Sequence, residues 1–154
     1  MANKGEAEKP LDDLIYQILE KLQKEVESKK LPLLERFTQL CLVGVPWETL
    51  TRFSPDELKE NLLGSFHFMD NKPPEAIKVR VFNPPKTVEG RSSAYTIIET
   101  TLKNQPFLID SIQLYLRRNN IKEISCIHPL FTIERDKKNR IIKIEPGTQP
   151  GIRE

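Results

Sequence analysis

The stretch from Ser93 to Asp136 constrains the fold most, because the spacing of its apolar side chains changes twice. A β-rich run gives way to an amphipathic helical pattern at residues 104–106, and a second β-rich run follows Asn119 and Asn120. This order predicts a strand at 94–102, a helix at 106–119 with Pro106 at its first position, and a long strand at 121–135. Pro129 lacks a backbone N–H, so we expect a bulge there and a place at the edge of a sheet.

The segments on either side add helices before this unit and one hairpin after it. Apolar residues recur at helical spacing behind Pro10, and a capping box of Ser54 and Glu57 marks a later helix start. Strand-like alternation runs through residues 77–82, and a polar turn at 136–139 leads into a last strand at 140–145. The expected helices before the strands are 11–30, 33–43 and 54–69.

These elements predict an α+β fold of about four strands, with helices packed on one face of the sheet. We divide the chain into an N-terminal helical segment (1–70), an α/β module (71–146) and a flexible tail (147–154). In the helix at 106–119 the inner face would hold four apolar residues: Leu108, Ile112, Tyr115 and Leu116.

Composition excludes several classes of function. A net charge of +2 among 154 residues gives no general case for nucleic-acid binding. A four-stranded sheet also raises RNA binding, but stacking aromatics on a central strand are not evident. The sequence has no apolar run of membrane-spanning length and no signal-peptide pattern, so we expect no membrane partner and a cytoplasmic location. Two cysteines far apart in sequence, Cys41 and Cys126, suit a reducing compartment.

Three segments together resemble the N-terminal ACT-like region of the large bacterial-type NAD-specific glutamate dehydrogenases. They are VRVFNP, TIIETTLKNQPFLIDSIQLYLRRNNI and IHPLFTIERD, which begin at Val79, Thr96 and Ile127. The resemblance covers roughly residues 37–142 and implies an ACT-like, or ferredoxin-like, sheet. An ACT fold has the order β-α-β-β-α-β, whereas the order read here enters that cycle at its second helix. Either strand 77–82 stands in for the missing last strand in a permuted sandwich, or the true fourth strand lies beyond Glu154.

The resemblance also implies a function. In this family a much later part of a very long polypeptide transfers hydride between glutamate and a nicotinamide cofactor, while the N-terminal region is regarded as regulatory. The six glycines of this chain contain no G-x-G-x-x-G, so we expect no catalytic residue and no cofactor site here, with NAD bound elsewhere in the parent enzyme. The chain is then a noncatalytic regulatory or assembly domain. The alternative is a free-standing ACT-like amino-acid sensor or protein-interaction adapter.

The expected partners are the remaining domains of the parent enzyme, a second copy of the chain and an amino-acid effector. ACT-like sheets commonly pair edge to edge or helix to helix, so self-association is expected through strand 121–135 or helix 106–119. In amino-acid-sensing ACT domains, the turn between strand and helix holds the ligand carboxylate with backbone N–H groups. By resemblance that turn is here Asn104, Gln105, Pro106 and Phe107, with Asp110 in the first helical turn.

The candidate effector turn departs from the pattern of ligand-binding members. Those members usually have Asp before the proline and Gly after it, where this chain has Asn104 and Gln105 before it and Phe107 after it. Phe107 removes backbone access that a glycine provides, and Asp110 would repel an anion. We therefore favour a tight turn with a core phenylalanine over a working site, and expect weak or absent amino-acid binding.

Other chemistry-bearing residues point to structure more than to reactivity. Cys126 and His128 have a spacing that could suit a metal, but a zinc site needs four groups, so we expect a buried thiol with a hydrogen-bonded histidine and no metal. Ser111 is next to Asp110, but adjacent helical residues do not face each other, and no histidine is placed to act as a base.

Overall fold

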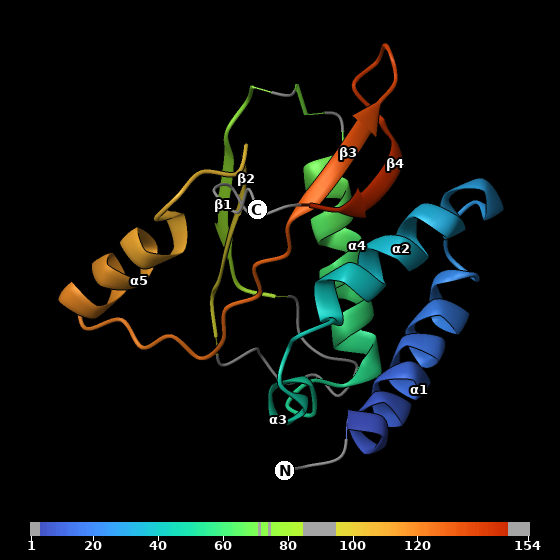
Figure 1. Ribbon diagram of the computed structural model, residues 1–154, viewed down its shortest axis with the longest axis horizontal. Helices are drawn as coiled ribbons and strands as arrows, with labels where there is room; N and C mark the ends of the chain where they lie inside the picture. Colours follow the sequence, from blue (N-terminus) through green and yellow to red (C-terminus); the bar gives the residue numbers. More distant parts are fainter. Residues whose placement is uncertain (1–3, 71, 74, 85–94, 148–154) are drawn as a thin grey trace.

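The computed structural model describes residues 4–70, 72–73, 75–84 and 95–147 (Figure 1). It mixes helices with small antiparallel sheets, as an α+β domain should. In chain order the elements are α1 (Lys4–Leu22), η1 (Ser28–Lys30, a 3-10 helix), α2 (Leu31–Leu42), α3 (Trp47–Leu50), α4 (Pro55–Met69), β1 (Lys78–Phe82), β2 (Ile97–Thr101), α5 (Leu108–Arg118), β3 (Phe131–Arg135) and β4 (Ile141–Pro146).

The first part of the chain is a bundle in which α1 packs on α4 and α2. Its most deeply buried side chains include Ile18, Leu22, Leu34 and Phe66, one or two from each of the three helices. Helix α4 begins with the predicted capping box, because Ser54 Oγ accepts from the Glu57 N–H at 3.2 Å and Glu57 Oε2 accepts from the Ser54 N–H at 2.8 Å.

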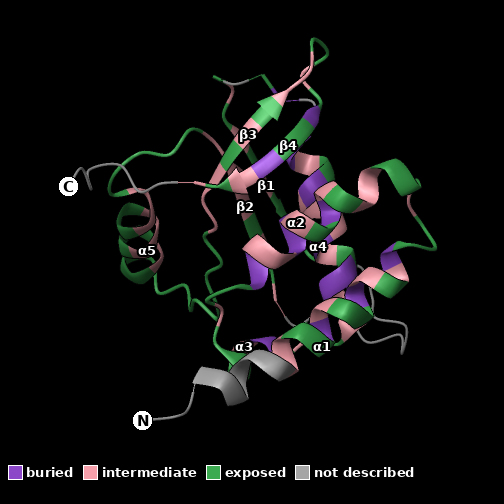
Figure 2. Cartoon of the chain, turned by 45° about the vertical axis from the view of Figure 1, so that its right-hand side comes forward, coloured by how far each residue is buried: buried purple, intermediate pink, exposed green. Residues whose placement is uncertain are grey.

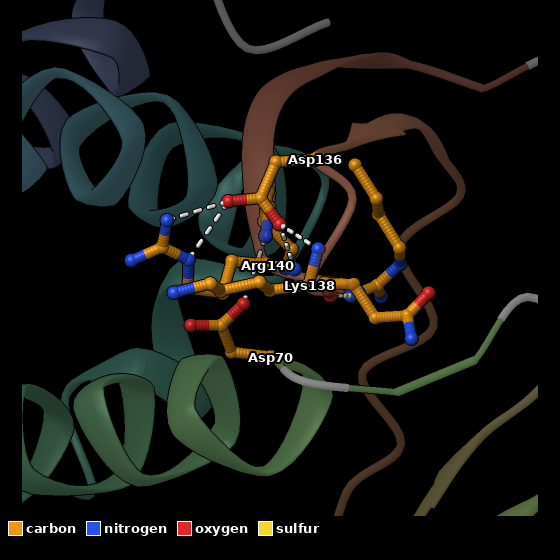
Figure 3. Close-up of polar contacts among 7 residues, drawn as sticks. Asp70, Asp136, Lys138 and Arg140 are labelled. Carbon is orange, nitrogen blue, oxygen red and sulfur yellow. Dashed lines mark hydrogen bonds and ion pairs between the residues drawn. The ribbon is translucent and has the colours of Figure 1, made fainter.

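The β3–β4 hairpin lies against this bundle and shares its core (Figures 1 and 2). Ile141 and Ile144 of β4 are both buried. The ring of Phe37 of α2 packs edge to face with Phe66 of α4 and at a tilt with Phe131 of β3. The hairpin joins helix α4 also through a buried hydrogen bond, in which Asp70 Oδ1 accepts from the Ile141 N–H at 2.8 Å (Figure 3). The bundle and this hairpin therefore form a single hydrophobic unit.

The turn between β3 and β4 is held by the side chain of Asp136 (Figure 3). Its Oδ1 accepts from the backbone N–H groups of Lys138 (2.8 Å) and Arg140 (2.9 Å), and Oδ2 pairs with the Arg140 guanidinium. Asn139 adopts a left-handed conformation with φ of 60°, which asparagine tolerates better than most residues. The predicted hairpin turn at 136–139 is confirmed.

The expectation of one four-stranded sheet is wrong for the described residues. β1 pairs only with β2 and β3 only with β4, so the strands form two separate antiparallel ladders. The expected long strand 121–135 is also wrong in its first part: β3 begins at Phe131, and residues 121–130 belong to no helix or strand. Pro129 cannot donate to a ladder, and without a continuous strand before it no pairing joins the two hairpins.

Several helix boundaries differ from the sequence prediction. α1 begins at Lys4, ahead of Pro10, and ends at Leu22, where hydrogen bonds such as that from the Glu25 N–H to the Leu22 carbonyl tighten into a turn. α5 begins at Leu108 instead of Pro106. α2 and α4 lie close to the predicted ranges 33–43 and 54–69.

Some expectations remain untested by this structure. Ala94, where the second strand was expected to begin, lies outside the described residues, as do residues 148–154 of the expected tail. The division of the chain near residue 70 stays a prediction. No helix in the described part of the chain is both long enough and apolar enough to cross a membrane.

Candidate functional site

The predicted effector turn lies between β2 and α5 and is open to solvent. The side chains of Asn104, Gln105, Pro106, Phe107 and Asp110 are all exposed, and none of them lines either of the two cavities described below. Phe107 itself is 75% exposed, so the interpretation of this residue as a core phenylalanine is wrong.

Phe107 is the residue that fixes the geometry of this turn. It is the N-cap of α5 and has φ of 61° and ψ of 10°, a left-handed conformation that is strained for a bulky side chain. No side-chain hydrogen bond caps the N-terminus of this helix, and its first intrahelical bond runs from the Ser111 N–H to the Phe107 carbonyl at 3.0 Å. The N–H groups of the first helical turn are therefore open to solvent or to a ligand. An anion bound there would be repelled by the negative charge of Asp110 in the same turn.

The β1–β2 hairpin places its charged side chains inward and most of its aliphatic ones outward. Arg80 pairs with Glu99 across the ladder, its guanidinium carbon lies 4.6 Å from the centre of the Phe68 ring of α4, and Lys78 donates to the Phe68 carbonyl. Cations are attracted to the faces of aromatic rings, which accounts for this inward orientation. The opposite face carries Ile77, Val79, Val81 and Ile98, which are 50–68% exposed.

Helix α5 is amphipathic but does not reach the core. No residue of α5 is buried, and Leu114 and Tyr115 are exposed (Figure 2). The predicted inner face is therefore wrong as a buried face, most clearly at Tyr115. The segment after the helix continues this pattern, with three isoleucines that are each about half exposed: Ile121, Ile124 and Ile127.

We call the outward face of β1–β2, helix α5 and the three isoleucines the exposed apolar segments. In Figure 1 helix α5 lies apart from the helical bundle, on the other side of the β1–β2 hairpin, and the segment after it runs back toward β3. Large apolar side chains are costly to expose in number, and such surfaces commonly mark contacts with another polypeptide. Sequence reasoning missed this arrangement because it assumed that α5 packs on a continuous sheet.

Two surface cavities lie beside helix α2, one mostly apolar and one mixed in its lining. The larger, about 350 Å³, is an open groove between α1 and α2 whose walls include Ile15, Leu19 and Val43, with Asp12 and Glu35 among its polar residues. The smaller, about 150 Å³, lies between residues 40–46 and residues 126–129. It is lined by Cys126 and His128, which are neighbours in the sequence, and by Cys41, which is far from them in the sequence.

The cysteines and the serine show no activated nucleophile. Burial raises the pKa of the Cys41 thiol to about 12, and partial burial also raises the pKa of Cys126. Cys126 is exposed, so the expectation of a buried thiol there is wrong. Ser111 is exposed on α5, and no group of three or more His, Cys, Asp or Glu side chains in the described residues is arranged to hold a metal ion.

Comparison with known proteins places this geometry in context. Residues 37–153 match the family model described as the glutamate dehydrogenase ACT1 domain. The chain is 31% identical over 132 residues to an NAD-specific glutamate dehydrogenase of Halomonas elongata, and 23% identical over 139 residues to one of Pseudomonas aeruginosa. These alignments cover 86% and 90% of the chain but only 8% and 9% of the two relatives. No solved structure matches the chain significantly.

Proposed function

The chain belongs to the glutamate dehydrogenase ACT1 domain family, and from this premise we propose that it is a noncatalytic assembly domain of a large NAD-specific glutamate dehydrogenase. The parent enzyme would deaminate L-glutamate oxidatively to 2-oxoglutarate and ammonium with NAD. Cofactor and substrate would bind in other domains. The location we propose for this enzyme is cytoplasmic.

The main support for an assembly role comes from the exposed apolar segments. Val79 and Val81 on the outward face of β1–β2 are 60% and 62% exposed, and amphipathic α5 buries none of its residues. A domain whose normal neighbours are other parts of a long polypeptide would cover such surfaces on docking, because burial of apolar area drives association. The occupant we propose is the remaining part of the parent enzyme, with a second copy of the chain as an additional contact through α5.

Two further observations support a domain without catalysis of its own. The sequence has no dinucleotide fingerprint among its six glycines. Both thiols have pKa values raised by burial, which disfavours the thiolate that a cysteine nucleophile needs. We expect the purified chain not to reduce NAD with glutamate. Turnover above a heat-inactivated control would contradict the noncatalytic proposal.

The docking proposal is tested with two valines of matched exposure. Val81 on the outward face of β1 and Val43 after α2 are 62% and 64% exposed. The tagged chain and the remaining part of the parent polypeptide are expressed separately and mixed, and complex formation is measured by size-exclusion chromatography with light scattering. Val81→Glu should abolish the complex, while Val43→Glu should retain it. Thermal melts verify that both variants are folded. If Val81→Glu binds as well as the unchanged chain, the outward face is not the docking surface.

The family resemblance also raises the binding of an amino-acid effector at the turn between β2 and α5. We propose that such binding is weak or absent in this chain. The residues concerned are Asn104, Gln105, Pro106, Phe107 and Asp110, and the groups available for a carboxylate are the N–H donors of the first turn of α5. Asn104 and Gln105 supply hydrogen bonds but no charge to hold an ammonium, and Asp110 would repel the carboxylate. Calorimetric titration with a panel of amino acids tests this. Saturable micromolar binding that Asn104→Ala abolishes would show that the turn is a working sensor.

A further inference from the structure

The two cysteines of the chain meet at one cavity although they are far apart in sequence. Cys41 comes from the last turn of α2 and Cys126 from the segment 121–130, and both line the cavity of about 150 Å³ between these elements. The chain contains no other cysteine. Cys41 is 7% exposed at the inner wall, whereas Cys126 is open to solvent.

The backbone around Cys126 can adjust to bring the sulfur atoms together. Residues 121–130 form no helix or strand, and the backbone hydrogen bonds at the two ends of the segment are from the Ile121 N–H to the Leu116 carbonyl and from the Gly147 N–H to the Leu130 carbonyl. A disulfide requires Cα atoms about 4.4–6.8 Å apart and a specific torsion. A segment outside any ladder can meet this requirement at lower cost than a paired strand would.

We propose that peroxide converts Cys41 and Cys126 into an intramolecular disulfide. The exposed Cys126 thiolate attacks one peroxide oxygen, the O–O bond breaks, and hydroxide leaves to give a sulfenic acid. The sulfur of Cys41 then forms the S–S bond and displaces the sulfenic oxygen, which leaves as water with the proton of Cys41. In total two thiols lose two hydrogen atoms, and one peroxide becomes two molecules of water.

This bond would tie the segment 121–130 to helix α2 and thereby fix one group of the exposed apolar segments against the bundle. Because burial raises the pKa of the Cys41 thiol to about 12, that sulfur is a poor leaving group in exchange with other thiols, so the bond should resist reduction once formed. Partial burial also raises the pKa of Cys126, whose thiolate attacks the peroxide, so formation of the disulfide should speed up as pH rises and the thiolate fraction increases.

The test is a peptide map of the whole chain after oxidation. Reduced protein is treated with hydrogen peroxide, remaining thiols are alkylated in urea, and the tryptic digest is analysed without reductant. We expect residues 37–52 linked to residues 123–135, in monomeric protein whose mass is lower by two hydrogen atoms. In Cys126→Ser, Cys41 should stay reduced and alkylatable, because the oxidant reaches the pair through Cys126.

Two results would overturn the proposal. One is a Cys126–Cys126 link between two chains, and the other is sulfinic acid at Cys126 with Cys41 still free. The same oxidation in urea separates a pair preorganised by the fold from chance encounter, since linking should slow down in the unfolded chain. Equal rates in native and unfolded protein would count against the proposed site. The map of the unsubstituted chain needs no variant, so the test stands even if Cys126→Ser fails to fold.

Discussion

A matched pair of isoleucines in β4 tests the bulge that positions the β3–β4 hairpin. Arg135 pairs with Ile141 and Glu134 with Lys143, so Ile142 is an extra residue without a partner. Strict alternation would place Ile142 and Ile144 on the same face. The bulge instead leaves Ile142 55% exposed and Ile144 3% exposed.

The expected effect of alanine differs between the two positions. Ile144→Ala removes buried methyl and methylene groups at about 0.8 kcal/mol each and leaves a cavity, for a total loss of about 2–5 kcal/mol. Ile142→Ala removes groups that are already half in water and leaves no enclosed cavity, so we expect a loss of about 1 kcal/mol or less. The lower strand propensity of alanine applies to both variants and largely cancels in their difference.

Urea unfolding followed by circular dichroism measures this difference. At about 2–4 °C per kcal/mol for a chain of this size, Ile144→Ala should also melt at least several degrees below Ile142→Ala. The slope of the unfolding free energy with urea should stay constant, so that the midpoints report stability alone. Equal losses at the two positions, or a greater loss at Ile142, would refute the bulged register.

Three further outcomes are expected. Asp70→Ala should lower stability by about 1–3 kcal/mol in urea unfolding, because the Ile141 N–H loses its buried acceptor, and Asp70→Asn, which retains a carbonyl oxygen, should lose less. Burial alone would lower the pKa of Lys59, but its hydrogen bonds to Glu25 and Glu60 outweigh this effect and raise the pKa. The stability of Lys59→Met in thermal melts should nevertheless stay within about 1 kcal/mol of the unsubstituted chain. Apolar packing can replace a buried ion pair, and both carboxylates reach solvent. The hydrogen bond from the Arg140 backbone N–H lowers the pKa of Asp136, and the Arg140 side chain lowers it further. The contribution of Asp136 to folding stability is therefore present above about pH 4 and disappears as pH falls through the lowered pKa. Melts of Asp136→Ala and the unsubstituted chain should therefore converge in acid, and a constant difference down to pH 2 would contradict this.

Local sequence determined the elements whose ends are fixed by neighbouring residues. The Ser54–Glu57 capping box starts α4 where predicted, because both partners lie within one turn of the chain. The hairpin at 136–139 depends likewise on Asp136 and Asn139, which satisfy the turn without distant contacts. The family resemblance was also readable from the sequence, since it depends on the order of residues alone.

Tertiary contacts decided which face each strand presents and which segments pair. The alternation of residues 77–82 was visible, but the contacts of Lys78 and Arg80 with Phe68, which lies on a separate helix, turned the charged face inward. The pairing of Ile141 with Arg135, and hence the bulge, depends on a partner strand that periodicity cannot identify. The cavity shared by Cys41 and Cys126 joins parts of the chain that are far apart in sequence. Helix caps and turns are stabilised by residues close together in the sequence, so the sequence alone can predict them. Which face of a strand is buried depends on packing with distant parts of the chain, which only the folded structure provides.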